Sequence, residues 1–84
     1  MMHRATASFW RKFDQLPDAV QSVARKNFEL LKRNPSHPSL RFKPISQVWS
    51  VRVGLGYRAL ALKRDDAYYW FWVGSHADYD RLIS

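Results

Sequence analysis

The sequence predicts an α+β fold, in which an N-terminal helical hairpin packs on a twisted, mainly antiparallel sheet of about four strands. The prediction rests on a change of periodicity near residues 34–39. Before this segment apolar residues recur at helical spacing, and after it come short runs rich in β-branched and aromatic residues. The runs are separated by short turns, which favour antiparallel neighbours. With 84 residues, the chain is expected to form one domain over residues 1–84.

The first predicted elements are a short edge strand and a helix. Residues 4–7 form a short segment before the first helix, and we interpret it as an edge strand. Ser8 is a suitable N-cap for a helix that places Phe9, Phe13 and Leu16 on one face. We therefore expect the first helix to begin at Ser8 and to end before Pro17.

The second predicted helix begins at Asp18. Gln21 follows three residues later, as in a capping box, and an apolar stripe runs from Val20 to Leu31. Asn34 and the prolines that follow it end the helix.

The second half of the chain predicts a four-stranded meander. A short glycine-bounded turn at residues 54–56 and a polar turn at residues 64–66 separate the later strands. These later strands are apolar on both faces over much of their length, so we expect them to lie centrally with one face under the helices. The expected strands are Leu40–Ile45, Val48–Val53, Tyr57–Lys63 and Tyr68–Val73.

The aromatic run at residues 68–72 has two interpretations. Exposed aromatic rings on a strand stack with nucleobases. Alternating aromatic rings on a central strand also pack against helices. The second interpretation is favoured, because alternate rings of a covered strand must meet the helices.

Composition narrows the class of partner and the compartment. Fourteen Lys and Arg residues against seven Asp and Glu give a formal net charge of +7, which attracts nucleic acid, acidic protein segments or anionic lipid. The absence of cysteine fits a reducing compartment. No signal-peptide core or membrane span is apparent, so a cytoplasmic location is expected. No cofactor and no metal site is expected, because the three histidines are scattered and lack zinc-site spacing.

Six polar residues of the meander are expected to meet on one concave surface. Two arginines interrupt otherwise apolar strands beside a turn, and a histidine and a tyrosine follow the last strand. Two further cations lie two residues apart, so they would share one face of the first strand. The six residues are Arg41, Lys43, Arg52, Arg58, His76 and Tyr79.

Such a set of side chains suits metal-free cleavage of RNA. The ribose 2′-hydroxyl is the nucleophile, a base takes its proton, and an acid protonates the 5′-oxygen that leaves. Fixed arginines stabilise the charge on the phosphorus centre. We assign catalysis to Arg58, His76 and Tyr79, and RNA binding to the cations Arg41, Lys43 and Arg52.

Each of these residues also has a purely structural interpretation. A strand arginine is commonly a solvated side chain or an ion-pair partner. A lone histidine often makes only structural hydrogen bonds, which is the interpretation preferred for His3 and His37, because neither has an evident partner. Tyr79 is equally suited to packing against the sheet.

Three segments resemble the RelE/ParE superfamily of toxins. They read NPSHPSL at residues 34–40, VWSVRVGLGYR at residues 48–58 and WVGSHADYDRL at residues 72–82. They are similar to the helix exit, the paired central strands with a Tyr-Arg step, and the glycine–histidine–tyrosine ending of these toxins. The order and spacing of the segments, which span most of the chain, carry the resemblance.

The resemblance implies a toxin of a type II toxin–antitoxin system. Many members are ribosome-dependent endoribonucleases that cut mRNA, and each is neutralised by an acidic, partly disordered antitoxin. By motif position, Arg58 corresponds to the arginine of the Tyr-Arg step, and His76 and Tyr79 correspond to the terminal pair. Lys43 and Arg52 correspond loosely to basic strand residues, and Arg41 is inferred from strand geometry alone.

The resemblance leaves two functions open. Some branches place the last imidazole and phenol side by side, whereas here Ala77 and Asp78 separate them, and the general base is unassigned. Other members inhibit DNA gyrase by binding it, without any chemistry, and the same fold serves both functions. An RNA-cleaving enzyme is the preferred hypothesis, and a gyrase inhibitor is the alternative.

Overall fold

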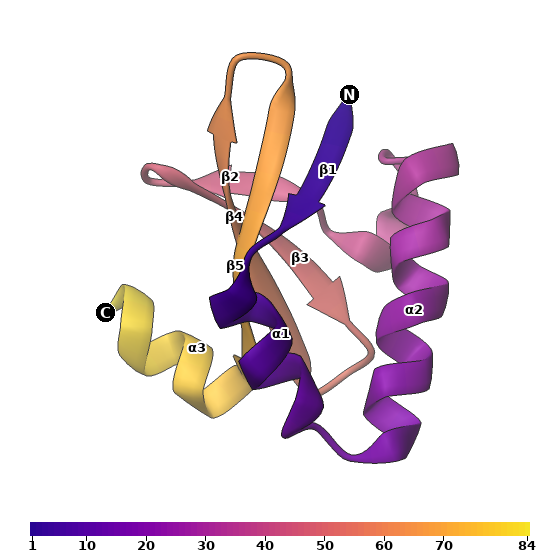
Figure 1. Cartoon of the computed structure of the whole chain (residues 1–84), viewed down its shortest axis with the longest axis vertical. Coiled ribbons are helices and arrows are strands. Elements are labelled where there is room, and N and C mark those ends of the chain that lie inside the picture. Colours follow the sequence, from indigo (N-terminus) through magenta and orange to yellow (C-terminus); the bar gives the residue numbers. More distant parts are fainter.

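The computed structural model describes residues 1–84 and contains three α-helices and five strands (Figure 1). None of the helices has the length and apolar character that crossing a membrane requires. A short 3-10 helix, Pro38–Leu40, precedes the second strand. In chain order the elements are β1 (Met2–Ala5), α1 (Ala7–Asp14), α2 (Asp18–Arg33), β2 (Lys43–Ile45), β3 (Val48–Val53), β4 (Tyr57–Arg64), β5 (Ala67–Ser75) and α3 (His76–Ile83).

The five strands form one mixed sheet in the order β1-β5-β4-β3-β2. Strands β2 to β5 form the antiparallel meander that the sequence predicts, and the α+β class is confirmed. The fifth strand is β1, which pairs in parallel with β5 and ends at Ala5. The expected edge strand at residues 4–7 is therefore displaced toward the N-terminus, because Thr6 already belongs to the cap of the first helix.

The two predicted helix caps are wrong in detail. Thr6, not Ser8, caps α1, since its hydroxyl accepts a hydrogen bond from the Phe9 backbone at 3.2 Å. The Ser8 hydroxyl instead donates to the Phe71 carbonyl at 3.0 Å and fixes α1 to β5. This bond falls on the part of β5 that the short β1 does not pair.

At the start of α2, Asp18 is the first helical residue and Pro17 precedes it without a side-chain cap. No capping box forms. The Gln21 side-chain amide instead donates to the carbonyls of Phe13 and Leu16, at 3.1 Å each. These two bonds tie the end of α1 to the start of α2.

The first strand of the meander is shorter than predicted. Leu40 ends the 3-10 helix and is fully buried, and Arg41 has a left-handed backbone with φ of 46°. Strand β2 therefore begins only at Lys43. Its Pro44 is tolerated because β2 is the edge strand, where no ladder bond on the outer side needs the missing N–H.

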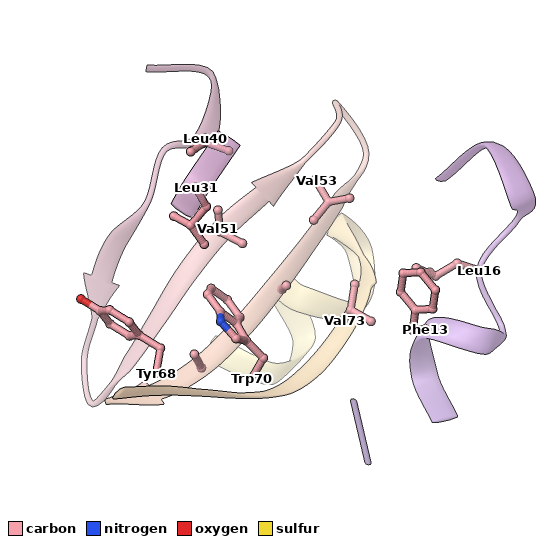
Figure 2. Packing of buried hydrophobic residues seen from close by; sticks show 11 residues of the cluster. Phe13, Leu16, Leu31, Leu40, Val51, Val53, Tyr68, Trp70 and Val73 are labelled. Carbon is pink, nitrogen blue, oxygen red and sulfur yellow. The ribbon is translucent and has the colours of Figure 1, made fainter. Parts of the chain in front are cut away.

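The core lies between the sheet and the helices, with α1 packed against β5 and α2 against β3 (Figure 2). Tyr68 and Trp70 both belong to it, so core packing of the aromatic run is confirmed for these two rings. A register shift between Leu60 and Ala61 makes Trp70 and Trp72 partners of adjacent β4 residues. The extra residue lets Val73 return to the core side, while Trp72 faces away from it.

The opposite face of the sheet is more open, and we call it the open face. Alternation places Arg52 of β3, Arg58 and Leu60 of β4, and Trp72 and Gly74 of β5 on this face. Only α3 covers part of it, and Figure 1 shows α3 and α2 on opposite sides of the sheet. Helix α3 was not among the predicted elements. The Ser75 hydroxyl caps it by accepting from the Asp78 backbone at 3.1 Å.

Candidate functional site

Two arginines lie side by side at the centre of the open face. Arg52 and Arg58 are direct partners across β3 and β4, and both side chains are half-buried. Arg58 donates to the Tyr57 carbonyl at 2.9 Å, whereas the buried Nε of Arg52 has no hydrogen-bond partner. The ion pairs of the molecule involve neither residue. Two facing cations without a carboxylate leave an excess of positive charge at this point.

The pKa of the Arg58 guanidinium is lowered from its ordinary value. Burial lowers this pKa most, and the neighbouring charge of Arg52 lowers it further. Arg41 also lowers it, while Tyr79 and Asp80 act in the opposite direction. The guanidinium still carries its charge at neutral pH, so an anion bound here would relieve the repulsion among the cations.

The other two predicted cations lie beside this pair. Lys43 of β2 is exposed and pairs with Ser50, which precedes Arg52 by two residues, so Lys43 lies on the open face. The prediction that Arg41 and Lys43 share the face of one strand is wrong, because Arg41 lies before β2 in a left-handed conformation. Arg41 is nevertheless close enough for its charge to act on Arg58.

The predicted tyrosine and histidine come to the same place on α3. Tyr79 is buried, and its ring centre lies 6.0 Å from Cζ of Arg58. The ring centres of His76 and Tyr79 are 5.9 Å apart. The His76 backbone N–H donates to the Gly56 carbonyl at 2.8 Å, which fixes the start of α3 to the turn between β3 and β4. Tyr79 therefore contacts both Arg58 and His76.

Asp80 is a member of this site that the sequence analysis missed. Its Oδ2 lies 3.2 Å from Nδ1 of His76, and both side chains are about half exposed. A carboxylate at Nδ1 fixes the orientation of the imidazole and leaves Nε2 free for proton transfer. The pairing of residues 76 and 80 could be predicted only by first predicting α3, because these residues become neighbours only at the i, i+4 spacing of a helix. Ser75 with Asp78 three residues later is the pattern that indicates such a helix.

The remaining histidines have structural roles. His37 caps the 3-10 helix by accepting from the Ser39 backbone at 3.2 Å. His3 was expected to have no partner, which is wrong: its Nδ1 accepts a hydrogen bond from the Trp70 indole at 3.0 Å. His3 also stacks on Tyr68 with ring centres 5.4 Å apart. No group of three or more His, Cys, Asp or Glu residues is arranged to hold a metal ion.

The fold recurs among solved toxin structures. A chain of the RelB–RelE antitoxin–toxin complex from Methanococcus jannaschii superposes with a TM-score of 0.74 at 15% identity, covering 96% of this chain and 99% of that one. YafQ from E. coli gives a TM-score of 0.70 at 13% identity, over 92% and 94% of the two chains. A YoeB/ParE toxin from Agrobacterium tumefaciens gives 0.68 at 19% identity, over 90% and 99%.

At these identities the structural likeness establishes the fold. A search among curated proteins finds no match. The model of the ParE-like toxin domain, however, matches residues 18–81, which include α2, the meander and most of α3. The chain therefore belongs to the family of ParE-like toxin domains.

Proposed function

We propose that this protein is the toxin of a toxin–antitoxin pair and that it cuts mRNA on the open face of its sheet. The observation that carries the proposal is the Arg52–Arg58 pair, which has no carboxylate partner and lies beside Tyr79. Family membership supports a toxin, and the arrangement of these residues supports a reaction at a phosphate.

The two arginines suit a scissile phosphate because a guanidinium binds phosphate oxygens through parallel hydrogen bonds. Arg58 supplies the contact nearest to the reacting centre, since it alone lies against Tyr79. The unpartnered Nε of Arg52 offers a second donor. Arg41 and Lys43 extend the positive surface and hold the flanking phosphates of the strand. Charge that builds up on the phosphorane in the transition state is stabilised by cations already in place.

The reaction is an intramolecular transfer of the phosphoryl group. The ribose 2′-oxygen attacks phosphorus, loses its proton to a base, and the bond to the 5′-oxygen breaks as that oxygen gains a proton from an acid. The products are a 2′,3′-cyclic phosphate and a 5′-hydroxyl end. His76, held by Asp80 through Nδ1, exchanges protons at its free Nε2, and Tyr79 offers its phenol beside Arg58.

The proposed partners follow from charge and from the related structures. The formal net charge of +7 favours an acidic antitoxin and an RNA substrate. Related toxins have been solved with antitoxins bound, among them the RelBE complexes from M. jannaschii and E. coli. The family resemblance further suggests that cleavage occurs on mRNA bound to the ribosome.

The test is to induce the protein in cells and to map new RNA 5′ ends, while measuring DNA supercoiling in the same culture. We expect new 5′-hydroxyl ends within reading frames and unchanged supercoiling. Relaxed DNA with intact mRNA would contradict the proposal and would favour the gyrase inhibitor, which has no chemical need of the Arg58, His76 and Tyr79 cluster.

A further inference from the structure

A groove beside the end of β5 has no role in the proposal above. It runs between the end of α1 and α3, has a volume of about 580 Å³, and has Trp72 and Gly74 of β5 on its wall. Lys12 of α1 and Gln15, the C-cap residue of this helix, line the groove together with Asp78 and Arg81 of α3. We refer to it as the Trp72 groove. Grooves of this size accept small organic ligands.

The indole of Trp72 lies directly over Gly74. A Cβ atom added to Gly74 would meet Cζ2 of Trp72 at 2.6 Å and Cη2 at 2.8 Å. Gly74 therefore lets the ring lie against the strand instead of standing away from it, while Trp72 remains only partly buried. A half-exposed ring held against a sheet is a surface on which another planar ring can stack.

The position of Gly74 connects the groove to the arginine pair. Gly74 is the direct partner of Arg58 across β4 and β5. The six-membered ring of Trp72 therefore reaches the neighbour of the residue to which we assign the scissile phosphate.

The polar side chains of the groove suit a base as well. Asp78 and Arg81 form an ion pair with each other, so Lys12 is the uncompensated charge of the rim. Gln15 carries both a donor and an acceptor, the groups that hydrogen-bond base edges. An aromatic ring on the wall, an amide and a cation together favour a nucleotide over an apolar peptide side chain.

We infer that the Trp72 groove binds the nucleobase that flanks the scissile phosphate, stacked on the Trp72 indole. The inference rests on the proposed function, since it takes the phosphate at Arg58 as given. It assigns Trp72 as a residue that sets affinity for one nucleotide and takes no part in the chemistry.

The test uses a short single-stranded RNA in which every 2′-hydroxyl is methylated, which cannot be cleaved because the nucleophile is blocked. Binding to the full chain is measured by fluorescence anisotropy at several salt concentrations. The same oligonucleotide is then prepared with one abasic residue at each position in turn. We expect one abasic position to weaken binding to the parent about tenfold, the size of a lost base stack.

The variant Trp72→Leu should weaken binding of the intact oligonucleotide by a similar factor and should make the sensitive abasic position neutral. Its salt dependence should match the parent, because no phosphate contact is removed. Trp10→Leu is the matched control, since Trp10 is an exposed indole on α1 that does not line the groove. It should leave the abasic profile unchanged.

Two results separate this inference from the proposed function. If Arg58→Ala weakens binding and lowers its salt dependence while no abasic position matters, the phosphate site stands and the base site is wrong. If neither Arg58→Ala nor Trp72→Leu affects binding, both are wrong. Should Trp72→Leu fail to fold, the abasic scan of the parent still decides, because a flat profile overturns the inference.

Discussion

The two faces of the central sheet differ although the same strands build both. On the helix-covered face, Val51, Ala59 and Val73 are apolar and almost fully buried. Arg52 and Arg58, which are the chain neighbours of Val51 and Ala59, lie opposite each other on the open face without an acidic partner. The covered face stabilises the fold by burying apolar area. The open face holds like charges together, an arrangement that stability alone does not favour and that an anionic ligand would explain.

The two faces should differ most in how much their side chains contribute to the free energy of unfolding. Leu40→Ala removes a leucine with no exposed surface from the covered side and should cost about 2–5 kcal/mol of unfolding free energy. Leu62→Ala makes the same chemical change at a residue that is 42% exposed on the open face, and should cost less than about 1 kcal/mol. Urea unfolding of both variants measures the contrast. Equal losses would show that the two faces contribute alike to stability.

A smaller effect concerns the cation without a partner. Arg52→Met keeps an unbranched stem but removes a buried Nε that makes no hydrogen bond and a charge that faces Arg58. We expect RNA cleavage to fall by about tenfold, because one phosphate contact is lost. Stability should be equal to the parent or higher by up to about 1 kcal/mol, since an unsatisfied buried donor is gone.

Thermal unfolding and cleavage assays on the same Arg52→Met preparation test this expectation. Lys26→Ala serves as a control that removes the same unit charge from an exposed position of α2. The account of the open face would be contradicted by a less stable Arg52→Met that cuts RNA at the parental rate.

The smallest expected effect is a pH dependence on the covered side. Burial, followed by the charges of the N-terminal amine and Lys32, lowers the pKa of His3 below its ordinary value of about 6.5. The folded state therefore favours neutral His3, whose Nδ1 must stay unprotonated to accept from Trp70. The stabilising contribution is complete above about pH 6.5 and is lost as the pH falls below this value, because the unfolded chain then takes up the proton more readily.

Melting temperatures at pH 7.5 and pH 5 measure this contribution. His3→Phe keeps a ring in the aromatic cluster but cannot be protonated, so its melting temperature should fall less between the two values than that of the parent. An equal fall in both proteins would remove His3 as the cause.

Periodicity predicted the parts of the fold that depend on local pattern. The start of α2 at Asp18, strand β3 at residues 48–53 and the antiparallel meander are all as expected. The wrong details came from contacts between elements. The Ser8 side chain donates to the Phe71 carbonyl and the Gln21 side chain to the Phe13 carbonyl, and neither contact is visible in the local sequence pattern.

The candidate site was predictable as a set of residues but not as a geometry. Strand alternation placed Arg52 and Arg58 correctly, since both lie in regular antiparallel strands. The contact between His76 and Asp80 was not predicted, because α3 is only eight residues long and its sequence was not recognised as a helix. The register shift at Leu60 likewise set the direction of Trp72, and a one-residue bulge is not visible in an aromatic run.

We propose that Arg58 on the open face stabilises a reacting phosphate. The most direct measurement is the rate at which Arg58→Ala cuts mRNA bound to ribosomes, compared with Lys26→Ala at equal concentrations of folded protein. We expect Arg58→Ala to be slower by about 10²-fold or more with a melting temperature close to the parent, and Lys26→Ala to cut normally. A folded Arg58→Ala that cuts as fast as the parent would contradict the claim.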